Sequence, residues 1–204
     1  MKKGEKRKRD LLKIAYDMFL SHGYENTSVD EIIEKAQIAK GTYYHYFKSK
    51  EQMLEEVIEM MIEREAEAAK QIIEMDIPVP QKIAGILSSV KPAEAEMPIE
   101  DALFHPENAL MHNKVRKKLI DVLTPLLSEV VREGTEKGIF ECDNIPERVR
   151  MLLVISNGTF NEGTFSERDI TVFIDTAEKI LGAEKGTMSF IYGLIDKSDM
   201  ETDE

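Results

Sequence analysis

Donor-bearing and cationic side chains are concentrated in residues 40–48 of this chain, which read KGTYYHYFK. Ile38, Tyr43 and Phe47 supply the apolar stripe that a short helix needs for anchoring, so the other side chains are left on its free face. A helix face rich in hydrogen-bond donors and cations suits the major groove of DNA, where phosphates flank the acceptor edges of the bases. The alternative interpretation is a polar surface helix with aromatic anchors.

Gly41 lies near the start of this stretch. A glycine inside a helix costs about 1 kcal/mol of helix propensity relative to alanine. We would expect a glycine here if a partner must approach the backbone closely, as DNA would.

Neighbouring helices are predicted to hold this stretch in place. Ser28 and Glu31 form the S-x-x-E pattern of a capping box, so a helix should begin there. Its apolar residues recur with helical spacing at Val29, Ile32, Ile33 and Ala36. The boundaries expected next are a turn at 37–39, a second helix at 40–47, and a third helix capped by Ser49 and Gln52.

With these residues in view, residues 11–54 closely resemble the N-terminal DNA-binding region of TetR-type (tetracycline-repressor-like) transcriptional regulators. The matching patterns, in order, are A-x-x-x-F-x-x-x-G-Y-x-x-T-S from Ala15 to Ser28, I-x-x-x-A from Ile32 to Ala36, and K-G-T-x-Y-x-Y-F-x-S-K from Lys40 to Lys50. Beyond the first quarter of the chain, only the all-helical layout and the chain length are similar to the family.

The resemblance implies a set of DNA-contacting residues. Lys40 and Thr42 are expected near base edges, and Tyr44, Tyr46 and Lys50 are expected on phosphates. The full set is Thr27, Ser28, Lys40, Gly41, Thr42, Tyr44, His45, Tyr46, Lys48 and Lys50. Of these, His45 has packing inside the domain as its alternative role, whereas Tyr43 and Phe47 are expected in the core.

Two positions depart from the family pattern. The family usually has glycine where Gln37 stands and serine where Ala39 stands. Loss of the serine removes a helix N-cap worth about 1 kcal/mol and a common phosphate contact. The fold should survive, but the operator preference of a relative cannot be transferred to this chain.

The charges are divided unevenly along the 204 residues. The formal net charge is −12, yet residues 1–50 carry 11 Lys and Arg against 7 Asp and Glu, a balance of +4. The rest carries 16 against 32, a balance of −16. Such asymmetry favours one nucleic-acid-facing end on an acidic body. The basic segment Lys2–Arg9 is then either a phosphate-contacting arm or merely a solubilising tail.

The cellular compartment is expected to be the cytoplasm. No run of 18 apolar residues is present, and the basic N-terminus lacks the apolar core of a signal peptide. The single cysteine, Cys142, cannot form an internal disulfide, which agrees with a reducing compartment.

The expected fold is all-α, with an N-terminal three-helix helix-turn-helix domain and a larger C-terminal helical domain. The predicted division is residues 1–50 for DNA binding, 51–196 for ligand binding and dimerisation, and 197–204 for an acidic disordered tail. The helices predicted outside the DNA-binding segment are 6–22, 49–75, 81–90, 99–104, 105–140, 145–160, a helix after residue 166, and 188–195.

A small-molecule pocket among the middle helices is expected only from the resemblance. The candidate lining residues are Phe104, His105, Asn108, Met111, His112 and Phe160, although methionine and aromatic stripes more often form plain core. His105, Glu107 and His112 match no established zinc spacing, so no metal site is expected. No catalytic or cofactor-binding motif is present either, which argues against an enzyme and predicts no cofactor.

The last third of the chain carries one-sided apolar stripes on two helices, which could pair with their copies in a homodimer. The resemblance favours this interpretation over packing within the chain. The candidate interface residues are Val149, Leu152, Leu153, Ser156, Ile170, Phe173, Ile174, Ala177, Ile180 and Leu181.

The sequence therefore predicts a ligand-responsive transcriptional regulator. It is expected to be a repressor that binds a pseudo-palindromic double-stranded operator as a dimer and is released by an unidentified, partly apolar effector. The alternatives are a DNA-binding protein without a ligand, and a helical small-molecule-binding protein with a non-functional DNA-binding head.

Overall fold

The computed structural model describes the chain except for residues 1–2, 92, 161–163, 196–199 and 201–204. The regular secondary structure of the described residues consists of α-helices and short 3₁₀ turns, with one isolated bridge between Phe165 and Met200. The expectation of an all-α fold is therefore confirmed. In chain order the elements are α1 (Lys3–His22), α2 (Val29–Lys35), α3 (Lys40–Tyr46), α4 (Lys50–Ile73), α5 (Val79–Ser89), η1 (Glu94–Glu96), α6 (Met97–Phe104), η2 (Pro106–Asn108), α7 (Ala109–Glu136), α8 (Ile145–Phe160), α9 (Glu167–Leu181) and η3 (Ser189–Gly193).

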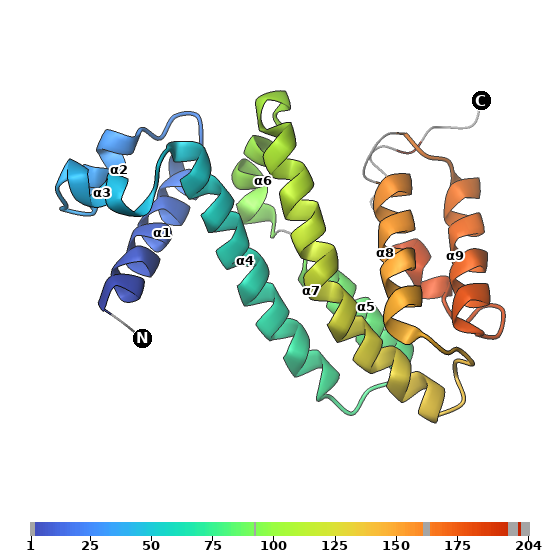
Figure 1. The fold of residues 1–204 in the computed structure, drawn as a ribbon. Helices are drawn as coiled ribbons and strands as arrows, with labels where there is room; N and C mark the ends of the chain where they lie inside the picture. Colours follow the sequence, from blue (N-terminus) through green and yellow to red (C-terminus); the bar gives the residue numbers. More distant parts are fainter. Residues whose placement is uncertain (1–2, 92, 161–163, 196–199, 201–204) are drawn as a thin grey trace. The chain divides into compact units, whose positions relative to one another are not determined.

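Two compact units divide the chain. Unit 1 comprises residues 1–65 and 92–118, and unit 2 comprises residues 66–91 and 119–204. The long helices α4 and α7 contribute residues to both units (Figure 1). This division differs from the expected boundary at residue 50, because α6 packs on α1 and joins the DNA-binding helices in one unit. The tail predicted at 197–204 lies outside the described residues except for Met200.

Unit 1 is organised around the buried faces of α1, α2 and α3. The apolar residues of α1 that meet this core recur at helical spacing, and they meet fully buried side chains of the following helices. These buried residues include Leu11, Ala15, Phe19, Ile32, Tyr43, Phe47, Met53 and Leu54. The core holds α3 by one side only, which leaves Lys40, Gly41, Tyr44 and His45 exposed.

A polar cluster links three separate segments of unit 1. Glu96 of η1 accepts hydrogen bonds from the Tyr16 hydroxyl (2.6 Å) and from the Arg64 guanidinium (2.7 Å). Its other carboxylate oxygen accepts from the backbone N–H of Ala93 (3.0 Å). Burial by itself would raise the pKa of Glu96, but the hydrogen bonds from Tyr16 and Arg64 outweigh it and leave the pKa below its usual value. The cluster thus holds a charged carboxylate between α1 and α4.

Unit 2 has its own apolar core, to which α5, the second part of α7, α8 and α9 contribute. Lys82 is buried and donates both to Glu133 (2.8 Å) and to the carbonyl of Ile73 (2.7 Å), so its charge is compensated. Gly182 ends α9 in the left-handed region at φ +63°, and a Cβ there would lie 2.1 Å from the carbonyl oxygen of Glu141. Only glycine fits that junction.

Among the described residues, no helix is both long and apolar enough to cross a membrane.

Candidate nucleic-acid interface

The local sequence fixes the start of α2 as predicted. The Ser28 hydroxyl oxygen accepts from the backbone N–H of Glu31 (3.2 Å), and the Glu31 carboxylate accepts from the backbone N–H of Ser28 (2.7 Å). This reciprocal capping box is confirmed, and its hydrogen bonds lower the pKa of Glu31. The cap fixes the residue at which α2 begins.

Both departures from the family pattern lie in the turn between α2 and α3. Gln37 has φ +51°, a left-handed conformation that glycine adopts without strain. Ala39 is the N-cap of α3 and provides no side-chain hydrogen bond. The chain therefore makes this turn with two residues that stabilise it less than glycine and serine would.

Helix α3 presents one face to the core and another to solvent. Tyr43 and Phe47 are fully buried, which confirms their expected role as anchors. Burial raises the pKa of the Tyr43 phenol to about 12, so it remains a donor, and it bonds the carbonyl of Ser49 at 3.3 Å. Tyr44 and His45 are exposed, and Thr42 is half-buried. The donor-rich face predicted from the sequence is therefore at the surface.

No contact or backbone angle within the folded chain requires glycine at position 41. Its backbone is in the ordinary helical region, and a Cβ at this position would meet no atom within 4 Å. A position of this kind tolerates any small side chain as far as folding is concerned. The open space above its backbone is where a closely approaching partner would fit.

Lys40 begins α3 and is held by a carboxylate of the neighbouring helix. Its ammonium lies 2.9 Å from the Asp30 carboxylate, and both side chains are largely exposed. The hydrogen bond and the charge of Asp30 raise the pKa of Lys40, so it stays a cation. Because an exposed pair of this type is weak, a phosphate or base edge can replace Asp30 as the partner of Lys40.

Two of the expected DNA contacts point inward. The Thr27 side chain is fully buried, and its hydroxyl donates to the carbonyl of Gly23 at 2.8 Å. The Lys50 ammonium donates to the carbonyl of Tyr24 (2.9 Å) and lies 4.1 Å from the centroid of that ring. Both side chains stabilise the domain in this conformation, so we do not include them among the proposed DNA contacts.

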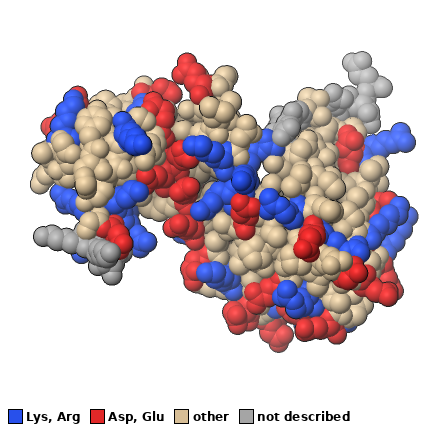
Figure 2. Space-filling view, in the orientation of Figure 1, with Lys and Arg blue, Asp and Glu red and all other residues tan. Residues whose placement is uncertain are grey.

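Most of the other residues predicted to contact DNA have exposed side chains. Ser28 and Lys48 are exposed, and Tyr46 is half-buried with its ring 5.0 Å from that of His45. Figure 2 shows Lys and Arg side chains on the surface of unit 1, among the tan residues of the helix-turn-helix segment. No sequence pattern indicates the inward orientation of Lys50, because its partner Tyr24 lies 26 residues away.

The six predicted pocket residues are divided between the two units, with Phe160 in unit 2 and the other five in unit 1. Phe104 and His105 are exposed, and the buried Asn108 side chain donates to the carbonyl of Ala102 (2.7 Å). Met111 is buried, and the His112 ring lies 4.6 Å from that of Phe104. Phe160 belongs to unit 2, where its ring packs against those of Phe165 and Phe173 at 5.1 and 5.3 Å. Their role in ligand binding stays a prediction.

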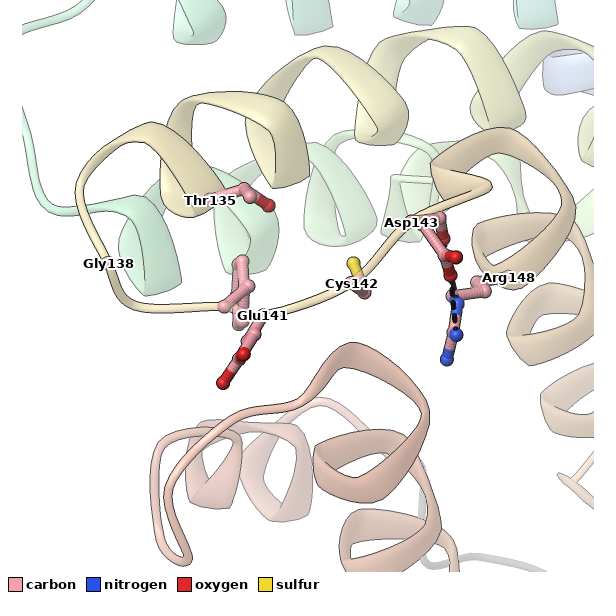
Figure 3. A pocket seen from close by; sticks show the side chains of 7 residues that line it. Thr135, Gly138, Glu141, Cys142, Asp143 and Arg148 are labelled. Carbon is pink, nitrogen blue, oxygen red and sulfur yellow. Dashed lines mark hydrogen bonds and ion pairs between the residues drawn. The ribbon is translucent and has the colours of Figure 1, made fainter.

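A surface cavity of about 590 Å³ does occur in unit 2, between the end of α7 and the start of α8 (Figure 3). Its lining includes Cys142 and Arg148. The Arg148 guanidinium donates to the Asp143 carboxylate (2.8 Å), to the Asp143 carbonyl (2.8 Å) and to the Ile180 carbonyl (2.5 Å). Since these hydrogen bonds already occupy the guanidinium, we assign no ligand to this cavity.

The apolar stripe predicted for dimerisation is only partly covered by the core of unit 2. Its buried members belong to the core of unit 2, and they are Val149, Ile170, Phe173, Ala177 and Leu181. The other members are half-buried, and they are Leu152, Leu153, Ser156, Ile174 and Ile180. Large apolar side chains that the prediction did not include are exposed next to them, namely Met151, Val154, Ile155 and Val172. The periodicity of each stripe identified the apolar face, but not which part of it the chain itself covers.

Comparison with known proteins agrees with the helix-turn-helix architecture. Residues 11–57 match the family model described as "Bacterial regulatory proteins, tetR family". The repressor KstR2 of Mycolicibacterium smegmatis is 26% identical over 141 residues, which is 67% of this chain and 69% of that protein. The TetC protein of transposon Tn10 from Escherichia coli is 44% identical over 46 residues, 22% of this chain and 23% of that protein.

Solved structures share the fold over nearly the whole chain. RolR without ligand superposes with a TM-score of 0.61 at 22% identity, covering 91% of this chain and 95% of RolR. RolR in complex with resorcinol gives 0.61 at 20% identity, covering 94% of each chain. A regulator from Mesorhizobium loti gives 0.58 at 15% identity, covering 95% of this chain and 93% of that chain. At identities this low, the similarity to these structures concerns the fold alone.

Proposed function

Because this chain belongs to the TetR-type family of transcriptional regulators, we propose that it is a repressor that binds a pseudo-palindromic operator as a homodimer. One α3 helix of each subunit enters the major groove, and the two half-sites lie about one helical turn apart, roughly 34–36 Å, or somewhat further. The named relative KstR2 is a transcriptional repressor, which favours repression over activation.

The observation that carries this proposal is the free face of α3. Lys40, Tyr44 and His45 are exposed on a helix whose other face is anchored by Tyr43 and Phe47. Open space lies over the backbone of Gly41 on the same helix. Cations, hydroxyls and an accessible backbone are what a helix needs to contact phosphates and base edges.

The homodimer is proposed to form through α8 and α9. Met151, Val154, Ile155 and Val172 are each at least 41% exposed, so their apolar surface is available to a partner. Gly158 on α8 leaves open space for a close approach, since a Cβ there would meet no atom within 4 Å. Pairing of two such helix pairs would bury this surface in a symmetric four-helix contact.

We further propose that a small molecule bound by the C-terminal domain releases the operator. RolR, which has a similar fold, has been solved with resorcinol, and this supports looking for a small organic effector. The effector can shift the equilibrium only by its differential affinity for the two states. If an effector binds equally well with and without operator DNA, this mechanism fails.

The test is selection of DNA from a random pool, followed by mobility shift with the enriched sequence at physiological salt. Lys40→Ala and Tyr44→Phe should both weaken a complex that contains two subunits. Lys185→Ala, an exposed lysine of unit 2, is the control and should leave the affinity unchanged. If no sequence is enriched, the regulator proposal is wrong.

A further inference from the structure

A groove on the surface of unit 1 lies where the first turns of α1 meet the end of α3. Its volume is about 500 Å³, and it is lined by Gly4, Lys6, Arg7, Asp10 and Tyr46. Helix α1 begins at Lys3, so these residues belong to a regular helix that continues into the core of the domain. From residue 3 onward the basic N-terminal segment is therefore part of helix α1, which places Lys6 and Arg7 next to α3.

The basic residues of this segment have different roles. The Lys8 ammonium forms an ion pair with Glu56 of α4 (2.5 Å), whose side chain is only 16% exposed, and lies 5.7 Å from the centroid of the Phe47 ring. Lys8 thus fastens α1 to the rest of the domain. Lys6 and Arg7, in contrast, are exposed and line the groove.

The third polar group of the groove comes from α3 itself. A Cβ on Gly4 would lie 3.7 Å from the Tyr46 hydroxyl oxygen, so that hydroxyl lies against the start of α1. An ammonium, a guanidinium and a phenol hydroxyl together offer donors and positive charge for a phosphate diester. Asp10 adds one negative charge at the rim, which disfavours small free anions and leaves the groove dependent on a partner held by other contacts as well.

We infer that this groove binds a backbone phosphate of the DNA that flanks each half-site, through Lys6, Arg7 and Tyr46. The inference rests on the proposed operator binding and adds two cations of α1 to the contacts expected from α3. DNA is the partner that fits, because Tyr46 belongs to the helix proposed to enter the major groove. The phosphate contact fixes the position of α3 along the DNA and carries no sequence preference.

The salt dependence of operator affinity tests this inference. Each phosphate neutralised contributes about −0.9 to the slope of log K against log salt, so one cation removed from both subunits should reduce the slope by about 1.8. Between 50 and 200 mM salt, the operator affinity of every variant falls. The factor by which it falls should be about 12-fold smaller for Lys6→Gln or Arg7→Gln than for the wild type. Tyr46→Phe should weaken binding to all sequences equally, without changing the slope.

Lys8→Gln is the matched control, because it removes the same charge from α1 at a position two residues after Lys6. It should lower the melting temperature by releasing Glu56 and should leave the slope near that of the wild type. The inference would be overturned if the wild type, Lys6→Gln and Arg7→Gln all showed the same salt slope. It would also be overturned if Lys8→Gln changed the slope as much as Lys6→Gln or Arg7→Gln does. If the wild type selects no DNA at all, the proposed function fails first, and the two failures are thus distinguished.

Discussion

Replacing Gly41 by alanine should stabilise the protein and weaken operator binding at the same time. Gly41 is the second residue of α3, its backbone is helical, and a Cβ would meet no protein atom within 4 Å. Alanine therefore introduces no clash within the chain and removes the entropic cost of a helical glycine. The free energy of unfolding should rise by up to about 1 kcal/mol, which corresponds to an increase in melting temperature of about 2–4 °C.

The same methyl group should oppose DNA binding if the groove edge approaches the backbone at Gly41. Inserting a methyl group into a closely packed contact costs about 1–3 kcal/mol, which is roughly 5- to 150-fold in affinity per half-site. The opposite signs exclude unfolding as the cause of weaker binding, because the weaker binder should also be the more stable protein.

Fluorescence anisotropy with a labelled operator measures the affinity, and thermal unfolding followed by circular dichroism measures the stability. An alanine variant that binds the operator as tightly as the wild type would refute the close approach at Gly41. The glycine would then be only a weak point of the helix. A variant that is less stable than the wild type would instead refute the reasoning about helix propensity.

Three further predictions concern the turn, the polar cluster and the subunit contact. Gln37→Gly and Ala39→Ser should each raise the free energy of unfolding by about 1 kcal/mol, as measured by urea denaturation, because one relieves a left-handed φ and the other supplies an N-cap. Glu96→Gln should lower it by about 1–3 kcal/mol at pH 7. Because the pKa of Glu96 is lowered in the folded state, its contribution is present above the ordinary carboxyl pKa and is lost as the pH falls through the folded value, so the difference between wild type and variant should shrink in acid. Val154→Asp, at a position that is 50% exposed, should give a folded monomer in analytical ultracentrifugation, and a persistent dimer would contradict the proposed use of α8.

Local features of the site were predictable from the sequence. The capping box of Ser28 with Glu31 and the buried pair Tyr43 and Phe47 depend on residues three or four apart along one helix. Such spacings translate directly into neighbouring positions on a helix surface, so pattern alone is sufficient. The exposed donors of α3 followed from the same periodicity.

Contacts between segments that are distant in the chain were decided only by the tertiary structure. The sequence does not show that Lys50 turns inward to Tyr24 or that Lys40 pairs with Asp30, since neither partner lies at a helical spacing. Likewise, Glu96 finds its partner Tyr16 80 residues away. A charged side chain of this length can reach solvent or several partners, and only the packing of the helices selects one of them.

The same limit applies to the apolar faces of α8 and α9. Helical periodicity determined that both helices have an apolar side. It could not determine that Ile170 and Phe173 are covered by the chain's own core while Val154 and Val172 remain exposed. The sequence by itself thus determined most of the helices, the capping box of α2 and the chemistry of α3, whereas the helix predicted at 188–195 is only a 3₁₀ turn, η3. The tertiary structure decided which cations are free and which apolar residues remain exposed, because burial depends on the neighbours that the fold brings to each face.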